Sequence, residues 1–306
     1  MSEYIRHGAI KISYRENENW IILSEIEQSI KKKIEQVGTP LKDWDIKINR
    51  GILTGLNEAF IISKEKKDEL IKADPKSAEI IRPILRGRDI KKNEINFSEK
   101  YLIALFPSKK YNIDNYPAIK DWLINGEWVQ IKTKGNPATP IGTGKERLEQ
   151  TGKTHIVNGI KFRSRKKTSN KWFETQDSIG YWDDLNRPKV AWNRIASKKI
   201  FGIVPPEFMV QDSVHFITGE NLKYLTAVLN SKLFSWLMTI IIGDAAGGNA
   251  GNASNVKDLT IIKPTENIIN KISILLEEHD TDEIDKIIYN LYALTDEEIR
   301  LVSSFE

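Results

Sequence analysis

Cysteine and long hydrophobic runs are missing from this chain of 306 residues, and histidine is scarce. Without cysteine, disulfides and thiolate metal sites are excluded, and the composition suits a reducing cytoplasm, where we expect the protein to reside. The four histidines are scattered and form no pair at helical ligand spacing. A structural zinc site is therefore not expected.

The sequence offers no segment typical of secretion or membrane insertion. Residues 1–19 are charged and polar without an apolar block, so a secretory signal is not expected. The most membrane-like stretch is Leu233–Ile242, whose ten residues are too few to span a bilayer. This stretch favours a buried helix, and we expect no membrane partner.

Complete catalytic motifs are missing as well. Gly152–Thr154 ends like a phosphate-binding loop, but Arg147 stands where the motif needs a glycine. Asn136–Thr139 and Val204–Glu207 each satisfy only part of the Asn/Asp-Pro-Pro-Tyr/Phe turn that adenine-N6 methyltransferases use. Glu65–Lys67 has the Glu-x-Lys form of many nucleases, although any lysine-rich helix supplies this triplet by chance. The chain alone is expected to have no catalytic centre, and a hidden nuclease is the weakest alternative.

Charge is distributed unevenly along the chain. Residues 120–199 hold 17 Lys+Arg against 8 Asp+Glu, a net charge of +9, whereas residues 200–306 hold 7 against 16, a net charge of −9. This pattern indicates a middle segment that binds a polyanion and a C-terminal third that faces something else. A solvated lysine-rich loop is the alternative explanation.

Two short runs combine glycine and arginine between apolar residues. They are Arg50–Phe60 and Arg82–Ile90. Glycine in such positions suggests tight turns or close backbone approach, and arginine suggests an anionic or planar polar partner.

Hydrophobic periodicity predicts a mixture of helices and strands. In Asn19–Gly38 we expect a short strand and then an amphipathic helix with Ile26, Ile30 and Ile34 on one face. Residues 125–170 show little periodicity and many glycines, which predicts a long irregular segment. Extended segments are expected at Asp45–Asn49, Glu58–Ser63, Tyr101–Phe106, Pro188–Ile195, Lys199–Val204 and Asp258–Lys263. Helices are expected at Glu65–Ala73, Pro117–Ile124, Asn221–Ile242, 265–278 and 281–302.

The basic middle contains side chains suited to reading DNA bases. Arginine and lysine can bridge guanine O6 and N7, and asparagine or glutamine can bridge adenine N6 and N7. The nearby aromatic residues Trp172, Phe173, Tyr181 and Trp182 are expected mostly in the core. The candidate base readers are Arg147, Gln150, Lys153, Asn158, Arg163, Arg165, Asn170 and Lys171.

Several segments, in order, resemble the TaqI-like C-terminal specificity domain of type IIG restriction-modification enzymes and adenine methyltransferases. Ile48–Phe60 and Ile81–Ile90 resemble its two Arg-Gly motifs, and Asn170–Glu174 and Lys189–Trp192 resemble two later elements. Further similar segments are Tyr224–Leu233, Ile284–Tyr292 and Leu294–Ile299. The resemblance extends from about residue 20 to 302.

The resemblance implies a mixed α/β (α+β) target-recognition domain with a mixed sheet, a long irregular basic segment and C-terminal bracing helices. It implies residues 1–45 as a connection from a missing methyltransferase domain, 46–264 as the recognition domain, and 265–306 as a C-terminal helical pair. A methyltransferase or nuclease domain is expected in cis or in trans, with S-adenosylmethionine and Mg²⁺ bound only there. The strand and helix before residue 40 favour a fragment of a longer enzyme over a separate subunit.

On this basis double-stranded DNA is the expected partner of a module without its own catalytic centre. The alternative is an assembly subunit whose acidic C-terminal helices dock a methyltransferase, with little direct DNA reading. The residues expected to contact DNA are Arg50, Arg86, Arg88, Lys134, Arg147, Lys153, Arg163, Arg165, Lys166, Lys167 and Lys171.

Overall fold

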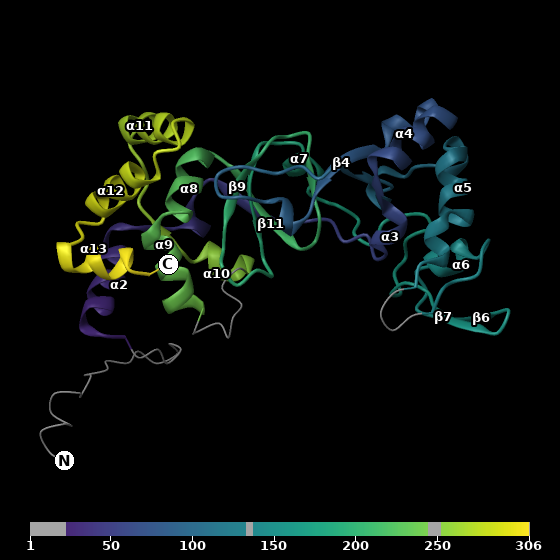
Figure 1. The fold of residues 1–306 in the computed structure, drawn as a ribbon, viewed down its shortest axis with the longest axis horizontal. Coiled ribbons are helices and arrows are strands. Elements are labelled where there is room, and N and C mark those ends of the chain that lie inside the picture. The colour runs from purple at the N-terminus through teal and green to yellow at the C-terminus, as the bar shows by residue number, and fades with distance from the viewer. Residues whose placement is uncertain (1–22, 133–136, 244–251, 306) are drawn as a thin grey trace, which may run out of the picture.

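Two four-stranded sheets lie between two groups of helices in this computed structural model, which describes residues 23–132, 137–243 and 252–305. Figure 1 shows the C-terminal helices and α2 at one end, the sheet that contains β11 in the middle, and helices α3–α6 at the other end. The expectation of a mixed α/β fold is confirmed.

The central sheet is antiparallel throughout. Strand β11 pairs with both β2 and β8, so that His215 lies opposite Arg50 on one side and Trp192 on the other. The strand order is β2 (Ile46–Arg50), β11 (Val214–Gly219), β8 (Lys189–Asn193) and β9 (Phe201–Val204).

The second four-stranded sheet is mixed, because β10 runs parallel to β4 while the other pairs are antiparallel. Its strand order is β10 (Met209–Val210), β4 (Ile81–Leu85), β5 (Lys100–Ile103) and β3 (Ile61–Ser63). Two further strand pairs join β1 (Thr39–Pro40) to β12 (Thr260–Ile261), and β6 (Thr154–Val157) to β7 (Ile160–Arg163).

The α-helices are short and are divided here into two groups by their place in the chain, although α2 packs in space with the C-terminal helices (Figure 1). The first group is α2 (Glu25–Val37), α3 (Asn57–Phe60), α4 (Lys64–Ala73), α5 (Pro117–Asn125), α6 (Gly144–Leu148) and α7 (Trp182–Leu185). The second is α8 (Leu222–Leu229), α9 (Lys232–Trp236) with a π-helix at Leu237–Gly243, α10 (Ala253–Lys257), α11 (Glu266–Glu277), α12 (Thr281–Leu291) and α13 (Asp296–Ser303). No helix within the described ranges is long and apolar enough to cross a membrane.

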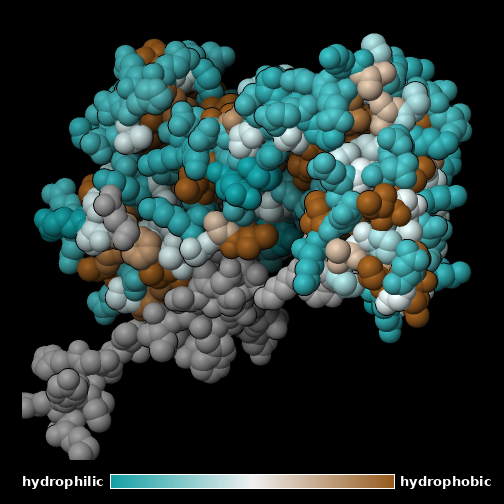
Figure 2. All heavy atoms as spheres, turned by 45° about the vertical axis from the view of Figure 1, so that its right-hand side comes forward, coloured by the Kyte–Doolittle hydropathy of each residue, from teal (hydrophilic) through white to brown (hydrophobic). Residues whose placement is uncertain are grey.

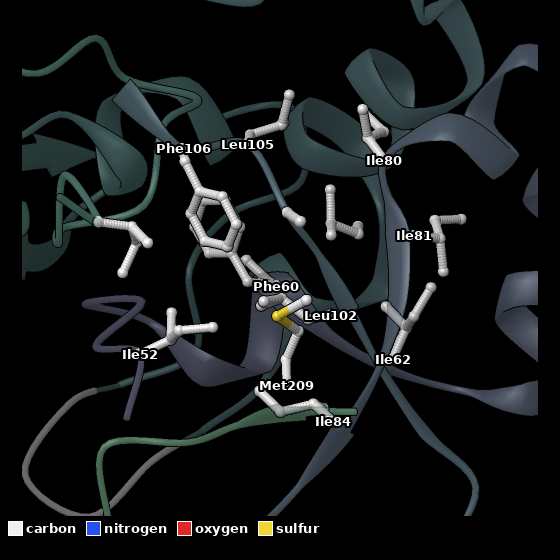
Figure 3. Close-up of a cluster of buried hydrophobic side chains, with 14 of the residues drawn as sticks. Ile52, Phe60, Ile62, Ile80, Ile81, Ile84, Leu102, Leu105, Phe106 and Met209 are labelled. Atoms are coloured by element: carbon white, nitrogen blue, oxygen red, sulfur yellow. The ribbon is translucent and has the colours of Figure 1, made fainter. Parts of the chain in front are cut away.

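The central sheet separates two hydrophobic cores. Because side chains alternate along a strand, Ile217 joins one core and its neighbour Phe216 joins the other. The first core also contains α2 and the C-terminal helices. The second contains the mixed sheet and helices α3 and α5, and Figure 3 shows Phe60, Phe106 and Leu102 close together within it. We call the part of the molecule around this second core the recognition lobe.

Helix α2 forms as its sequence predicts. Ser24 caps it in a reciprocal capping box with Glu27, and Ile30 and Ile34 are buried with Ile26 packed beside them. The strand expected before it lies mostly outside the described residues. Helix α2 shares its core with the C-terminal helices, while the expected division of the chain at residues 45 and 264 stays a prediction.

Two expected helices are broken by capping residues. The helix expected at Asn221–Ile242 stops at Asn230, whose side chain bonds both backbone groups of Phe201, and Ser231 caps the next helix. The helix expected at 281–302 is two helices, because Thr295 begins α13 with a capping box. The expected C-terminal pair is therefore three helices.

Other expectations were wrong in detail. The extended segment expected at Glu58–Ser63 begins inside helix α3, and only Ile61–Ser63 form a strand. The segment 125–170 is less irregular than expected, since it holds α6 and the β6–β7 hairpin. The central strand β11 has no counterpart among the expected elements. The strands expected at 188–195 and 199–204 and the helices at 65–73 and 117–124 are confirmed within a few residues.

Close backbone approach explains the glycines of both Arg-Gly runs. A Cβ at Gly51 would overlap the backbone of Gln211, and a Cβ at Gly87 would overlap the side chain of Asn193. Gly55 has φ +80°, a conformation that L-residues rarely adopt. These glycines therefore shape the scaffold, as their sequence pattern indicates.

Candidate nucleic-acid interface

A β-hairpin projects from the recognition lobe. Strands β6 and β7 pair antiparallel, with Thr154 opposite Arg163 and Ile156 opposite Lys161. Asn158 and Gly159 form the turn, and both have positive φ, which matches the tight turns that suit twisted hairpins. Figure 1 shows β6 and β7 extending past α6 at the edge of the lobe.

The two faces of the hairpin differ. The inner face holds Phe162, which is 2% exposed and stacks on His155 with ring centroids 5.5 Å apart. The outer face is exposed at every position, and Ile156 is 71% exposed. Its residues are Thr154, Ile156, Lys161 and Arg163.

Backbone pairing continues below the hairpin and anchors it. The Gly152 amide donates to the Arg165 carbonyl at 2.8 Å, and the Ser164 amide donates to the Lys153 carbonyl at 2.9 Å. The guanidinium of Arg163 donates through Nε to the Gly152 carbonyl at 3.1 Å. The hairpin base is therefore fixed by contacts that do not depend on its tip.

A basic hollow lies at this base. Exposed Lys166 and Lys167 follow Arg163 in the chain, and the hydroxyls of Thr151 and Ser164 lie 3.0 Å apart. We call this site the basic hollow, and it is lined by Thr151, Gly152, Arg163, Ser164, Lys166 and Lys167. Cationic side chains beside hydroxyl groups are suited to holding a phosphate.

Arg165 is an interior residue. It is 4% exposed, and its guanidinium donates four hydrogen bonds of 2.7–2.8 Å and lies 5.1 Å from the ring centroid of Phe60. Burial lowers the pKa of Arg165 to about 9, while nearby Glu174 raises it. The acceptors are the carbonyl groups of Leu148, Thr54, Trp172 and Glu174. The expectation that Arg165 contacts DNA is corrected, because its guanidinium joins segments of the lobe.

Two expected base readers also belong to the scaffold. Gln150 is buried and its amide nitrogen donates to the carbonyls of Lys171 and Glu174. Asn170 donates to the carbonyls of Thr175 and Gln176. Their amides hold the turn after the hairpin and are not presented to a ligand.

Of the other candidate DNA contacts in the middle segment, Arg147, Lys153 and Lys171 lie within the described residues. Arg147 is half-buried, donates to the Arg163 carbonyl, and has its pKa lowered by burial. Lys153 is exposed, and Lys171 is exposed with its ammonium 5.6 Å from the centroid of the Phe173 ring. Lys134 lies outside the described residues.

The arginines of the opening runs contact carboxylates. Arg50 is exposed on β2 and forms an ion pair with Asp177 at 2.7 Å. Arg86 pairs with buried Asp89 at 3.2 Å; burial raises the pKa of Asp89, but hydrogen bonds from Arg86 outweigh it and hold that pKa below its usual value. Arg88 is exposed.

The aromatic residues after the hairpin pack as expected. Phe173 is buried, and Trp172, Tyr181 and Trp182 pack against the second core. Within the described ranges, no group of three or more His, Asp and Glu side chains is placed to hold a metal ion.

The structure thus brings Lys153, Arg163, Lys166 and Lys167 together at the hairpin base. Thr154, Ile156 and Lys161 were missed, although the sequence held the signal for them. Asn158-Gly159 between two apolar-polar alternating segments is the strongest short-range hairpin pattern.

The recognition lobe turned forward in Figure 2 has a mainly hydrophilic surface with scattered hydrophobic patches.

Comparisons with known proteins agree with the fold. A family model described as the TaqI-like C-terminal specificity domain matches residues 82–248. The run Ile48–Phe60 and the C-terminal helices lie outside that matched range. None of the curated proteins matches the chain.

Solved structures of restriction-modification enzymes are similar to this chain. The structure of the type IIL enzyme MmeI in complex with DNA aligns with a TM-score of 0.50 and 14% identity, over 86% of this chain and 35% of that one. The type IIG restriction endonuclease BpuSI aligns with a TM-score of 0.45 and 13% identity, over 83% of this chain and 28% of that one. The chain spans about a third of the length of these enzymes, and the likeness to MmeI shows the fold.

Proposed function

Because the chain belongs to the family of TaqI-like C-terminal specificity domains, we propose that it is the DNA target-recognition module of a restriction-modification enzyme. The observation that carries this proposal is the basic hollow and hairpin on the recognition lobe, within the residues that match the family model. Arg163, Lys166 and Lys167 neutralise phosphates there, which fixes the position of the lobe on the duplex.

The catalytic steps belong to another domain or subunit. We propose that an adenine-N6 methyltransferase or nuclease domain works beside this module in cis or in trans. S-adenosylmethionine and Mg²⁺ bind in that catalytic part. The chain supplies position and sequence preference.

The salt dependence of DNA binding tests the proposal. Four cations, Lys153, Arg163, Lys166 and Lys167, predict a slope of about −3.6 for log affinity against log salt, or roughly a 100-fold loss for about a fourfold rise in salt. Fluorescence anisotropy of the full chain with labelled duplexes measures this slope. Replacing Lys166 and Lys167 by alanine should reduce the slope by about two.

A matched lysine pair on the C-terminal helices provides the control. The Lys271→Ala/Lys286→Ala variant carries the same charge change on α11 and α12, and should leave the slope unchanged. A slope near zero for the unmodified chain would contradict DNA binding. Co-purification with a methyltransferase, together with no shift of any duplex, would instead select the assembly-subunit function.

A further inference from the structure

The outer face of the β6–β7 hairpin presents four exposed residues of complementary chemistry. The side chains of Lys161 and Arg163 carry hydrogen-bond donors but no acceptor atoms, the Thr154 hydroxyl can donate or accept, and Ile156 is apolar. None of the four is acidic. Ile156, with 71% of its surface exposed, lies opposite Lys161 in the register.

The hairpin is ordered before it meets any partner. Its Asn158-Gly159 turn has φ values of +50° and +75°, and its base is pinned by the Gly152–Arg165 and Ser164–Lys153 backbone bonds. On the inner face Phe162 is 2% exposed and stacks on His155 of the paired strand. A preformed ribbon loses little conformational entropy when it binds.

The dimensions of the hairpin match the major groove of DNA. A two-stranded ribbon fits that groove, which is about 12 Å wide and about 8.5 Å deep. Ile156 and Lys161 lie two residues closer to the turn than Thr154 and Arg163, which corresponds to about 7 Å along an antiparallel strand. When the tip-side pair reaches the base edges, the base-side pair therefore lies near the phosphates at the rim.

We propose that this hairpin enters the major groove tip first and reads base pairs through Asn158, Ile156 and Lys161. Lysine donates to guanine O6 or N7, asparagine pairs with adenine N6 and N7, and an apolar side chain contacts a thymine methyl group. Arg163 and the basic hollow hold the phosphates at the rim. This inference rests on the proposed DNA-recognition function and names its reading element.

Enrichment from a library of random duplexes by the full chain supplies the test. Affinities are then measured by anisotropy for the enriched duplex and for a scrambled duplex of the same composition. Ile156→Ala and Lys161→Ala should each weaken binding to the enriched duplex by about 10-fold, and each should relax preference at one base pair. Ile156→Ala should leave the scrambled duplex within about twofold.

The hollow and a distant surface provide contrasting variants. Lys166→Ala/Lys167→Ala should weaken both duplexes equally, since phosphates carry no sequence information. Ile274→Ala removes an exposed isoleucine from α11 and should change neither affinity. Circular dichroism melting confirms that each surface variant stays folded.

Two failures can be told apart. The chain could enrich a sequence motif that stays the same in Ile156→Ala, Lys161→Ala and Asn158→Ala. That result would overturn the hairpin assignment, while the recognition function would stand. Equal losses on both duplexes for the tip variants would also overturn it. If the unmodified chain enriches no motif and binds no duplex, the proposed function itself fails.

Discussion

Replacing Arg165 by methionine removes a buried charge that joins distant segments of the recognition lobe. The guanidinium donates four hydrogen bonds, to carbonyls that belong to residues 54, 148, 172 and 174. Methionine retains most of the apolar stem but leaves the carbonyls of Leu148 and Trp172 without this donor, while those of Thr54 and Glu174 keep a second one from the Gln176 amide and the Gln150 side chain. The change therefore probes the hydrogen bonds more than the packing.

The expected cost follows from two opposing contributions. Hydrogen bonds to a charged group contribute about 1.5–3 kcal/mol each, and removing the guanidinium also relieves a desolvation cost of several kcal/mol. The net loss in the free energy of unfolding should be about 3–5 kcal/mol. Urea unfolding followed by tryptophan fluorescence measures it, since Trp172 lies beside the site and its carbonyl is one of the four acceptors.

The control is Arg163→Met, two residues away on the exposed face of β7. It removes only an exposed hydrogen bond to the Gly152 carbonyl, so it should change stability by no more than about 1 kcal/mol, but it should weaken DNA binding. If Arg165→Met left stability within 1 kcal/mol and reduced the salt slope of DNA binding, the interior role of Arg165 would be refuted. The two variants therefore separate scaffold from contact.

Three further predictions concern the scaffold. Gly51→Ala should lower the free energy of unfolding, measured by urea titration, by at least about 2 kcal/mol, because the added Cβ overlaps the Gln211 backbone. The control Gly180→Ala, with open space around the added Cβ, should be nearly neutral. Burial, with help from nearby arginines, lowers the pKa of His215 to about 4. The stability contributed by neutral His215 is therefore present above its unfolded pKa of about 6.5 and is lost as the pH falls towards 4. Thermal melting between about pH 6.5 and 4 should show a smaller loss of stability for His215→Asn than for the unmodified chain. Thr295→Ala removes the cap of α13 and should cost about 1 kcal/mol in chemical denaturation, with Thr239→Ala as an exposed control.

Local patterns predicted most elements of this fold. The i, i+4 spacing of Ile30 and Ile34 and the proline near the start of α5 are local signals, and both helices form where expected. The break at Asn230 was missed because its cause is a contact with Phe201, 29 residues away in the chain. Helix propensity alone could not reveal that partner.

The candidate site shows the same limit. Its basic composition was visible in the sequence, and exposed Lys166 and Lys167 line the basic hollow. Arg165 was indistinguishable from them by composition, since only the folded chain shows that its side chain turns inward. The Asn158-Gly159 dipeptide indicates a hairpin turn in the sequence, although no hairpin was expected there.

The strand order of the central sheet has a consequence for the recognition lobe. The chain leaves this sheet at Arg50, the end of β2, and returns at Lys189, the start of β8, and these two strands flank β11. Their axes are only about 10 Å apart, but both strands run antiparallel to β11, so Arg50 and Lys189 lie at opposite ends of the sheet and about 14 Å apart. Residues 51–188 form an insertion between two strands of one sheet, and β10 of the receiving frame pairs with β4 inside it. Exchange of this segment between related chains therefore has to preserve the β10–β4 pairing. A chimaera that replaces this insertion by that of a relative should retain the first core and acquire the donor's sequence preference.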